Sequence, residues 1–365
     1  MKIICTRQNL IQGVTTAQRA VSTKNPMPIL SGILLIAKDN RLELQATDLE
    51  MGIQCFVPCT TQEEGSIVLP AKYLSEIVKR LPDSPIQIET IQGTNVIIRY
   101  GQSEITINGF DAEEFPIFPK TQSKNSLTIS EESLKEYLRQ ILFATSPDEN
   151  RPVFTGVLME FLNGNLRLVA TDTHRLAMRG MECSSVEDDI NIIIPGKTLN
   201  ELTRVIGAAD RQVTISLGEN QVIFSMEDTT LISRLIEGQF PNYRQVIPQG
   251  YKTRIRVKTK DLIEAAERAS LLARVGTQII RLNIEEEKIV ITANTEVGRI
   301  HEEVPIYLQG EPVQIAFNAI YLIDALRAIS SDHIYFDMSG SLSPGILTPV
   351  GGEEYLSLVL PVRTA

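Results

Sequence analysis

Three segments of the chain alternate apolar and polar residues in the same way. They read RLELQATDLE at 41–50, NLRLVATDTH at 165–174 and KIVITANTEV at 288–297. In each segment every second residue over the first half is apolar, which is typical of a β-strand with one buried face. Because the copies are spaced by about a third of the chain, they indicate an internal repeat.

A second pattern follows each of these strands. The segments 66–81, 191–206 and 314–329 each predict a strand, a short turn and an amphipathic helix. A Phe-Pro pair closes the first two units, at 115–116 and 240–241, whereas the third unit ends in YLSLVLPVRTA. Three landmarks in one order at one spacing indicate that the whole unit is triplicated.

The repeat predicts an α+β fold with three similar domains, each with two helices packed on antiparallel sheet. Within a unit, we expect a strand, a helix, three or four alternating strands, a second helix and several more strands. Polar, proline-bearing stretches at 119–126 and 244–253 predict the linkers. The predicted domains are 1–120, 126–245 and 250–365, and the predicted helical windows are 9–24, 72–80, 131–146, 197–209, 258–274 and 318–330.

The charge of the chain is unevenly distributed. Its 35 Lys and Arg against 45 Asp and Glu give a net charge of −10, which as an average argues against binding to DNA or anionic lipid. Counted separately, however, the helical windows carry +5 and the remaining residues −15. If the helices of all units point the same way, one surface is mildly basic and suits weak, salt-dependent contact with a phosphate backbone.

The cations recur on corresponding helices. The helices after the second landmark in the first two units present basic residues opposite their apolar faces, and a helical face of this kind is by itself most simply a solvated surface. The residues concerned are Lys72, Lys79 and Arg80 in the first unit, Lys197 and Arg204 in the second, Arg19 and Lys24 in the first window, and Lys135 and Arg139 in the third.

Other classes of function find little support. Residues 29–37 form the most apolar stretch and are too short to span a bilayer, and Arg7 and Gln8 interrupt any signal peptide. Phosphate-loop, dinucleotide, nucleophile-elbow and zinc-protease motifs are absent from the sequence, so neither a cofactor nor a metal is expected. Cys5, Cys55, Cys59 and Cys183 form no metal-binding pattern and are interpreted as reduced thiols of a cytosolic protein.

One cluster could carry chemistry. In ATDTHRLA, 170–177, the residues Asp172, His174 and Arg175 lie within four positions, and a histidine beside a carboxylate can act as a general base. The simpler interpretation is a turn after a strand, in which Asp172 caps backbone amides while His174 and Arg175 remain available for recognition. No nucleophile or phosphate loop accompanies the cluster, which favours the turn.

The chain resembles the bacterial sliding clamps, the beta subunits of replicative DNA polymerases. The resemblance extends over the whole chain and is carried by PMPILSGILL (26–35), ATDTHRLA (170–177), IEGQFPNYRQVIP (236–248), NAIYLIDAL (318–326) and LPVR (360–363). It implies a ring-shaped homodimer of the DNA clamp fold, with helices lining the hole and sheets outside. The implied function is that of a cytoplasmic, non-catalytic processivity factor that encircles duplex DNA and slides on it.

The resemblance also implies partners and sites. The partners are duplex DNA through its backbone, the replicative polymerase, the clamp loader, and repair and translesion polymerases that bind through a short peptide, with no membrane. DNA contacts would fall on Lys24, Lys79, Arg80, Lys197 and Arg204. Dimer closure would bury exposed apolar residues, Ile105 and Ile107 on one side and Leu271 and Leu272 on the other.

The partner peptide of the family is received by a pocket formed by the second and third domains. Carried over to this sequence, the pocket consists of Phe154, Thr171, His174, Arg175, Leu176, Pro241, Val246, Leu342, Leu360, Pro361, Val362 and Arg363. Its apolar members would take the anchors of the peptide, while Thr171, His174 and Arg175 would orient it. The sequence departs from the family pattern at Gln245, at Pro344 and at the terminal Thr364-Ala365.

Two other functions remain open from the residues alone. A repeated α+β protein could be a structural adaptor that never touches DNA, and Asp172 with His174 could serve an enzyme. Topological retention on circular DNA separates the clamp from the adaptor, because an adaptor has no ring to enclose the duplex.

Overall fold

The computed structural model of the chain describes residues 1–22, 27–118, 125–182, 189–207, 210–273, 278–352 and 354–363. Each of the six predicted helical windows contains a helix, so this prediction is confirmed. A short helix, α4, was not predicted. The helices are α1 (Arg7–Ala17), α2 (Ala71–Arg80), α3 (Glu131–Ile141), α4 (Pro152–Thr155), α5 (Gly196–Val205), α6 (Thr259–Ala273) and α7 (Ala319–Arg327).

The strands confirm the triplicated order of strand, helix, strands, helix and three final strands. The first repeat contains β1 (Lys2–Cys5), β2 (Gly32–Lys38), β3 (Arg41–Thr47), β4 (Met51–Pro58), β5 (Thr60–Glu63), β6 (Gly65–Pro70), β7 (Ile86–Thr90), β8 (Asn95–Tyr100) and β9 (Ser103–Asn108). The second contains β10 (Asn125–Ser130), β11 (Gly156–Leu162), β12 (Asn165–Thr171), β13 (Arg175–Glu182), β14 (Ile190–Pro195), β15 (Gln212–Leu217), β16 (Gln221–Ser225) and β17 (Thr229–Arg234). The third contains β18 (Thr253–Lys258), β19 (Ile279–Ile284), β20 (Lys288–Thr295), β21 (Gly298–Gly310), β22 (Val313–Asn318), β23 (His333–Met338), β24 (Gly345–Pro349) and β25 (Tyr355–Val359).

Side-chain caps start the first helix of the first repeat and the second helix of the third. Thr6 Oγ1 accepts a hydrogen bond from Asn9 N at 3.2 Å, and Asn318 Oδ1 accepts from Ile320 N at 2.9 Å. These bonds satisfy amides that have no partner within the helix. The first helix is shorter than predicted, because α1 ends at Ala17 and a 3₁₀ turn follows.

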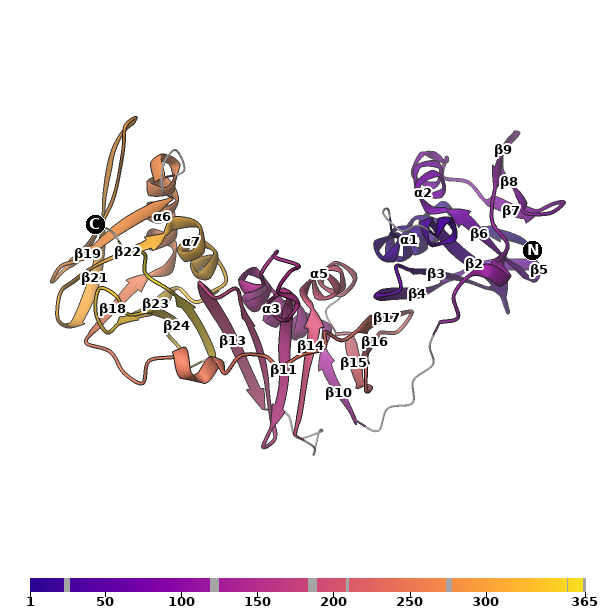
Figure 1. Ribbon diagram of the computed structural model, residues 1–365. Helices are drawn as coiled ribbons and strands as arrows, with labels where there is room; N and C mark the ends of the chain where they lie inside the picture. The colour runs from indigo at the N-terminus through magenta and orange to yellow at the C-terminus, as the bar shows by residue number, and fades with distance from the viewer. Residues whose placement is uncertain are drawn as a thin grey trace. The chain divides into compact units, whose positions relative to one another are not determined.

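The first compact unit comprises residues 1–133 and 201–235. It holds a five-stranded sheet in the order β5-β1-β7-β8-β9 and an eight-stranded sheet in the order β10-β15-β16-β17-β4-β3-β2-β6. Helix α1 packs on β3 and β4 and contacts α2, as the indigo end of Figure 1 shows. The alternation in 41–50 is explained by this packing, since Leu42 and Leu44 point to the helix side and are fully buried.

The second compact unit comprises residues 134–200 and 236–365. Its single sheet has twelve strands in the order β14-β11-β12-β13-β25-β24-β23-β18-β21-β20-β19-β22. Helices α6 and α7 contact each other, and α6 packs on β19, β20 and β21 (Figure 1). Leu262, Ala266 and Ala269 of α6 are fully buried, as an amphipathic helix with one apolar face requires.

Strand pairing joins one repeat to the next within each unit. In the first unit, β4 of the first repeat pairs with β17 of the second, and in the second unit, β13 of the second repeat pairs with β25 of the third. In both cases a four-stranded group of one repeat continues a four-stranded group of the following repeat. This pairing covers strand edges whose amides and carbonyls would otherwise lack partners.

The cysteines that the structure describes are free thiols. Cys5 and Cys55 are buried in the first unit, and burial raises the pKa of each thiol to about 12. They are therefore protonated at neutral pH and behave as small apolar side chains. Cys183 lies outside the described residues.

Within the described ranges, the structure contains no helix that is both long enough and apolar enough to cross a membrane.

The core of the third repeat provides a test of the packing. Phe317 and Phe336 have ring centroids 5.7 Å apart and are fully buried. We expect Phe336→Ala to lower the free energy of unfolding by about 3–5 kcal/mol, because it removes a large buried ring and leaves a cavity. Tyr307→Ala, on strand β21 of the same sheet and 77% exposed, serves as the control and should change it by less than about 0.5 kcal/mol. Urea unfolding followed by circular dichroism measures both, and equal midpoints would contradict the packing.

Candidate functional site

The turn between β12 and β13 is held by its own side chains. Asp172 Oδ1 accepts hydrogen bonds from His174 N and Arg175 N, both at 2.9 Å, which confirms the predicted capping role of Asp172. Thr171 Oγ1 donates to Arg175 O at 2.7 Å and accepts from Thr173 N at 3.2 Å. Thr173 has a φ of 79°, a conformation that this dense bonding stabilises.

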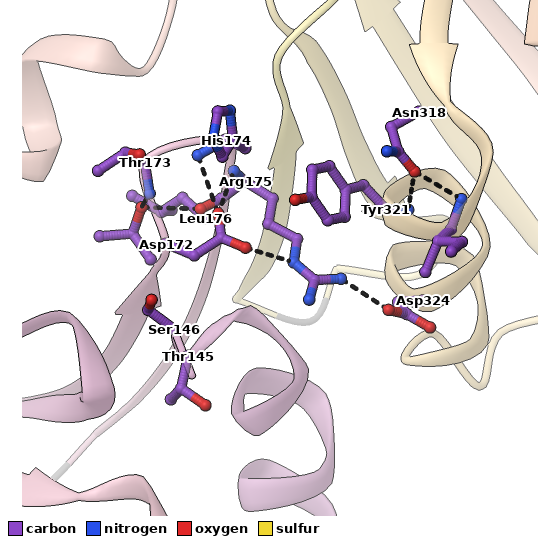
Figure 2. Close-up of polar contacts among 12 residues, drawn as sticks. Thr145, Ser146, Asp172, Thr173, His174, Arg175, Leu176, Asn318, Tyr321 and Asp324 are labelled. Carbon is purple, nitrogen blue, oxygen red and sulfur yellow. Dashed lines mark hydrogen bonds and ion pairs between the residues drawn. The ribbon is translucent and has the colours of Figure 1, made fainter. Parts of the chain in front are cut away.

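Arg175 connects this turn to the last helix of the chain. Its Nε lies 3.0 Å from Asp172 Oδ2 and its Nη1 lies 2.7 Å from Asp324 Oδ2 on α7. The guanidinium carbon also lies 4.6 Å from the ring centroid of Tyr321 and 5.3 Å from that of Phe143. Figure 2 shows Arg175 extended between the two carboxylates. The charge of Arg175 is thus already neutralised by these two carboxylates. Arg175 therefore fixes the geometry of the site and does not act as a free cation for a ligand.

His174 lies beside the same helix. Its ring is stacked on Tyr321 with centroids 5.9 Å apart and an interplanar angle of 22° (Figure 2). His174 O accepts a hydrogen bond from Leu360 N at 2.9 Å, which ties the turn to the residues after β25. Asp172 is used for capping and for Arg175, so it does not orient His174 as a base. Within the residues that the structure describes, no cluster of side chains could hold a metal ion.

A cavity of about 210 Å³ opens beside this turn. Most of its exposed surface is apolar, and its polar groups come mainly from the turn, which is the usual composition of a site that binds an apolar anchor. The lining residues are Phe154, Thr171, Thr173, His174, Arg175, Leu176, Pro241, Asn242, Tyr243, Val246, Leu358 and Leu360.

A buried carboxylate anchors Tyr243, one of the residues that line the cavity. Tyr243 Oη donates to Glu160 Oε2 at 2.9 Å, and Arg244 Nη2 lies 2.5 Å from the same oxygen. Tyr243 and Glu160 are both buried, and burial together with Glu160 raises the pKa of the Tyr243 hydroxyl. These bonds hold the 3₁₀ turn of residues 243–246 in place, with Val246 half exposed at the cavity.

The structure brings together most of the pocket residues that the resemblance implied. Phe154, Thr171, His174, Arg175, Leu176, Pro241, Val246 and Leu360 line the cavity. Four others do not line it: Leu342 is 65% exposed in a loop, Arg363 is exposed, and Pro361 and Val362 are half-buried. Val362 instead donates its amide to Ala316 O at 2.8 Å, and so extends the sheet interactions of the chain end.

Four lining residues were not predicted. Thr173 lies inside the ATDTHRLA segment and Asn242 and Tyr243 lie inside the FPNYRQV segment, so the motifs pointed to them without identifying them. Leu358 belongs to β25, and nothing local in YLSLVL distinguishes it from an ordinary core residue.

The candidate DNA-contact residues of the first repeat lie on α2. Lys79 and Arg80 are both exposed in the last turn of this helix. Lys79 Nζ lies 3.9 Å from Glu76 Oε1, and Arg80 forms an ion pair with the other oxygen of Glu76. The hydrogen bond from Arg80 holds the pKa of Glu76 below its ordinary value. Each pair is solvent-exposed, so the acid partly offsets the cations without binding them tightly.

The same arrangement recurs on α5. Arg204 is exposed and its Nη1 lies 2.9 Å from Glu201 Oε1, while Arg19 reaches the second oxygen of Glu201 at 3.1 Å. Arg19 therefore belongs to an ion pair on a 3₁₀ turn and not to a free helical face, which corrects the predicted window. Lys197 is exposed in the first turn of α5, and Lys24 lies outside the described residues.

The candidate dimer residues differ in exposure. Ile105 on β9 is half-buried, Leu271 on α6 is 65% exposed and Leu272 is half-buried. Ile107 is only 8% exposed, so the prediction that it is an exposed apolar residue is wrong. Its side chain points to the buried face of the β7–β8–β9 sheet, where alternation places every second residue.

The first repeat contains a copy of the turn, hydrogen bond for hydrogen bond. Thr47 Oγ1 donates to Met51 O at 2.9 Å and accepts from Leu49 N at 3.0 Å, and Asp48 Oδ1 accepts from the amides of Glu50 and Met51. Leu49 has a φ of 76°, close to that of Thr173. The shared Ala-Thr-Asp letters therefore encode one turn geometry in both repeats.

The cavity beside this first-repeat turn differs in chemistry. It has a volume of about 290 Å³ and is bordered by Leu49, Glu50 and Phe118. Phe118 lies directly over Gly52, where a Cβ would come within 2.7 Å of the ring. Tyr243, which holds the corresponding place after the second Phe-Pro pair, is instead tied to Glu160. The turn is common to both repeats, whereas the walls of the two cavities are not.

Family models match the chain in three consecutive parts. They are described as the N-terminal, central and C-terminal domains of the DNA polymerase III beta subunit, and they match residues 1–119, 128–242 and 244–363.

Individual relatives match over their full length. The Beta sliding clamp of Bacillus subtilis is 36% identical over 377 residues and that of Halalkalibacterium halodurans is 37% identical over 379, with 100% of both chains covered in each case. Among solved structures, the DNA polymerase sliding clamp from Bacillus subtilis has a TM-score of 0.96 at 35% identity. A putative DNA polymerase III beta subunit from Eubacterium rectale has a TM-score of 0.95 at 34% identity, and both structures cover 100% of each chain.

A double-mutant cycle tests how strongly Arg175 ties the turn to α7. We expect Arg175→Ala and Asp324→Ala to show a coupling free energy of about 1–3 kcal/mol, because Arg175 is largely buried between two carboxylates. The control cycle uses Arg327, which lies on α7 like Asp324, and Glu267 on α6, an exposed pair at 2.7 Å, and should give less than about 1 kcal/mol. Chemical denaturation measures both cycles, and equal coupling would show that Arg175 contributes no more than a surface pair.

Proposed function

The chain belongs to the family of bacterial DNA sliding clamps, the DNA polymerase III beta subunits, and on this basis we propose that it acts as a processivity factor that encircles duplex DNA and tethers the replicative polymerase to it. The observation that carries this function is the match of all three repeats, in order and over the whole chain, to the three domains of that family. The family is not enzymatic, and Asp172 and His174 act in the binding turn and not in catalysis.

The charges on the helices suit a protein that slides. Glu76 and Glu201 lie within ion-pair distance of the exposed cations Lys79, Arg80 and Arg204. Phosphate contacts made by cations that keep an acidic neighbour are weak and strongly salt-dependent. A closed ring needs no tighter contact, because topology and not affinity retains the duplex.

The strand pairing supports ring closure by two copies. Each junction of repeats joins two four-stranded groups, and among the described strands two such groups remain without this partner: β1-β7-β8-β9 of the first repeat and β21-β20-β19-β22 of the third. We propose that β9 of one protomer pairs with the free edge of β21 in its partner, over Gly298–Val304, as β17 pairs with β4 and β25 with β13. Two identical head-to-tail contacts then close the ring without a free edge.

The apolar residues near these edges agree with that assembly. A Cβ placed on Gly298 would lie 3.9 Å from Leu272 Cδ1, so Leu272 borders the edge of β21 that lacks a partner. Leu271 is 65% exposed beside it, and Ile105 is half-buried on β9. An interface over these residues removes apolar surface from water.

The cavity beside Thr171–Leu176 is proposed to receive a short peptide from partner proteins. Its apolar walls fit an aliphatic or aromatic anchor, and the exposed ring of His174 and the Thr173 side chain border its entrance. The proposed partners that use this pocket are the replicative polymerase, the clamp loader, and repair and translesion polymerases. They meet the clamp in the cytoplasm, where a bacterial chromosome is replicated.

The first test is retention on DNA. We expect the protein, after loading by a clamp loader, to elute with nicked circular DNA in gel filtration and to be released when the DNA is linearised, because a ring that encloses a duplex slides off it only over a free end.

Leu272→Glu should be monomeric by light scattering and should not be retained, because the substitution places a charge at the proposed interface. Leu49→Glu, an equivalent change at a 45% exposed leucine of the first repeat, serves as the control. Equal retention on linear DNA would contradict enclosure, and an unchanged dimer mass for Leu272→Glu would contradict the interface.

The second test is peptide binding. We expect Val246→Asp to weaken binding of a fluorescent peptide from the clamp-binding segment of the replicative polymerase by roughly thirtyfold, the loss of about 2 kcal/mol typical of a central anchor contact. Leu342→Asp is the matched control, because Leu342 is exposed but lies outside the cavity lining. Fluorescence anisotropy measures both affinities. A similar loss in the two variants, or in neither, would contradict the pocket as the structure defines it.

A further inference from the structure

Strand β18 in the third repeat presents cations on one face only. Thr253, Ile255 and Val257 are buried toward the core that contains α6 and α7, so Arg254, Arg256 and Lys258 lie on the opposite face of the sheet. Arg256 and Lys258 are exposed, and an exposed lysine at position 252 precedes the strand in the same alternation. Successive cations along such a strand are about 6.6–6.8 Å apart, comparable to the phosphate repeat of an extended single strand of nucleic acid.

Tyrosines flank this row of cations on both sides. Arg256 pairs with Tyr335 of β23 on one side and with Tyr307 of β21 on the other. Tyr307 is 77% exposed, and Tyr251 in the preceding loop is 36% exposed. Side chains directly opposite each other on one face of a sheet are close neighbours, so aromatic rings and cations alternate across these three strands.

Arg254 makes one part of this surface rigid. Its guanidinium carbon lies 4.0 Å from the ring centroid of Tyr251 and 4.8 Å from that of Tyr335. Its Nε and Nη2 both lie 2.6 Å from the two oxygens of Asp337, and this pairing raises the pKa of Arg254. The carboxylate neutralises Arg254 while fixing the two tyrosines that pack against it.

The remaining cations are less occupied. Within the described part of the chain, Arg256 forms no ion pair, and Lys258 reaches only Asp261, at 3.8 Å. A cavity of about 500 Å³ lies beside them, bordered by Tyr307 and His333 and, on its acidic side, by Glu286 and Glu287. Asp261 lies beside Lys258, and Glu286 and Glu287 directly precede β20 on the far side of β21, whereas Arg256 lies between Tyr335 and Tyr307 with no ion pair in the described residues.

We propose that this face of β18, β21 and β23 binds single-stranded nucleic acid, with phosphates over Arg256 and its neighbouring cations and a base stacked on Tyr307. A cationic track beside exposed aromatic rings is the arrangement that binds single strands without reading their sequence. A duplex keeps its bases stacked on each other, so it cannot use Tyr307 in this way. An acidic peptide could meet the cations but gains nothing specific from an aromatic ring at this spacing. The site lies on the face of the sheet opposite α6 and α7 and does not depend on the duplex contacts proposed for the helices.

The test is fluorescence anisotropy of a labelled oligothymidylate with the full-length protein. Tyr307→Ala should weaken binding at least about fivefold, the lower end of the range for losing one stacked base, whereas Tyr307→Phe should bind like the wild type. The salt dependence separates the two kinds of contact. Arg256→Ala should reduce the slope of log affinity against log salt by about 0.7, the value for one phosphate of a single strand, and Tyr307→Ala should leave the slope unchanged.

Lys260→Ala is the charge-matched control, because Lys260 is 77% exposed beside the strand but pairs with Glu264 on α6. It should bind like the wild type. Equal losses for Arg256→Ala and Lys260→Ala would overturn the site, as would wild-type affinity of Tyr307→Ala. Competition by a blunt duplex of equal length with the same potency would overturn the preference for a single strand. Displacement by polyglutamate, combined with identical behaviour of Tyr307→Phe and Tyr307→Ala, would identify a surface for acidic peptides instead.

Discussion

The edge of an antiparallel sheet is the constraint on which this structure depends. A strand at an edge exposes a row of amides and carbonyls that need partners, and burial without them is costly. The chain meets this constraint by repetition, because β4 takes β17 as its neighbour and β13 takes β25. The repeats are therefore joined by main-chain hydrogen bonds, and the site turn lies at one such junction: β13 begins at Arg175, directly after the turn, and Arg175 is paired there with Val359 of β25.

Local patterns predicted the elements, and distant partners determined the rest. The alternation around Leu42, Leu166 and Ile289 was enough to place a strand in each repeat, because burial of one face is a property of the strand itself. The ion pair of Arg175 with Asp324 joins residues far apart in the sequence, and no local pattern near either residue predicts it. The twelve-stranded sheet, in which the third repeat continues the second, was likewise beyond any local pattern.

The same distinction separates the shape of the turn at Thr171–Arg175 from the chemistry around it. Ala-Thr-Asp specifies the turn, since Thr and Asp bond to the backbone within their own segment, and the first repeat reproduces it. What surrounds the turn is specified elsewhere. Tyr243 is tethered to Glu160 beneath one cavity, whereas Phe118, which has no hydroxyl, lies on Gly52 in the other. A motif search can therefore find both turns but cannot decide which of them borders an open apolar pocket.

The net charge of −10 is consistent with two different modes of contact with nucleic acid because the acids are placed selectively. On the helices, Glu76 and Glu201 lie beside the cations, and an acid within one helical turn weakens the proposed phosphate contacts without abolishing them. On β18 the cations lie on a strand whose alternation sends every second side chain to one face, so acids can be excluded from that row by sequence alone.

Asp337 is an exception, because it is an acid that lies beside this row of cations. It lies on the neighbouring strand, and its bidentate pairing with Arg254 holds a guanidinium between two aromatic rings, so the carboxylate organises the surface at the cost of one charge. The two proposed contacts thus require different placements of acids: beside the cations on the helices for weak contact with a duplex, and outside the row of cations on β18 for binding of a single strand.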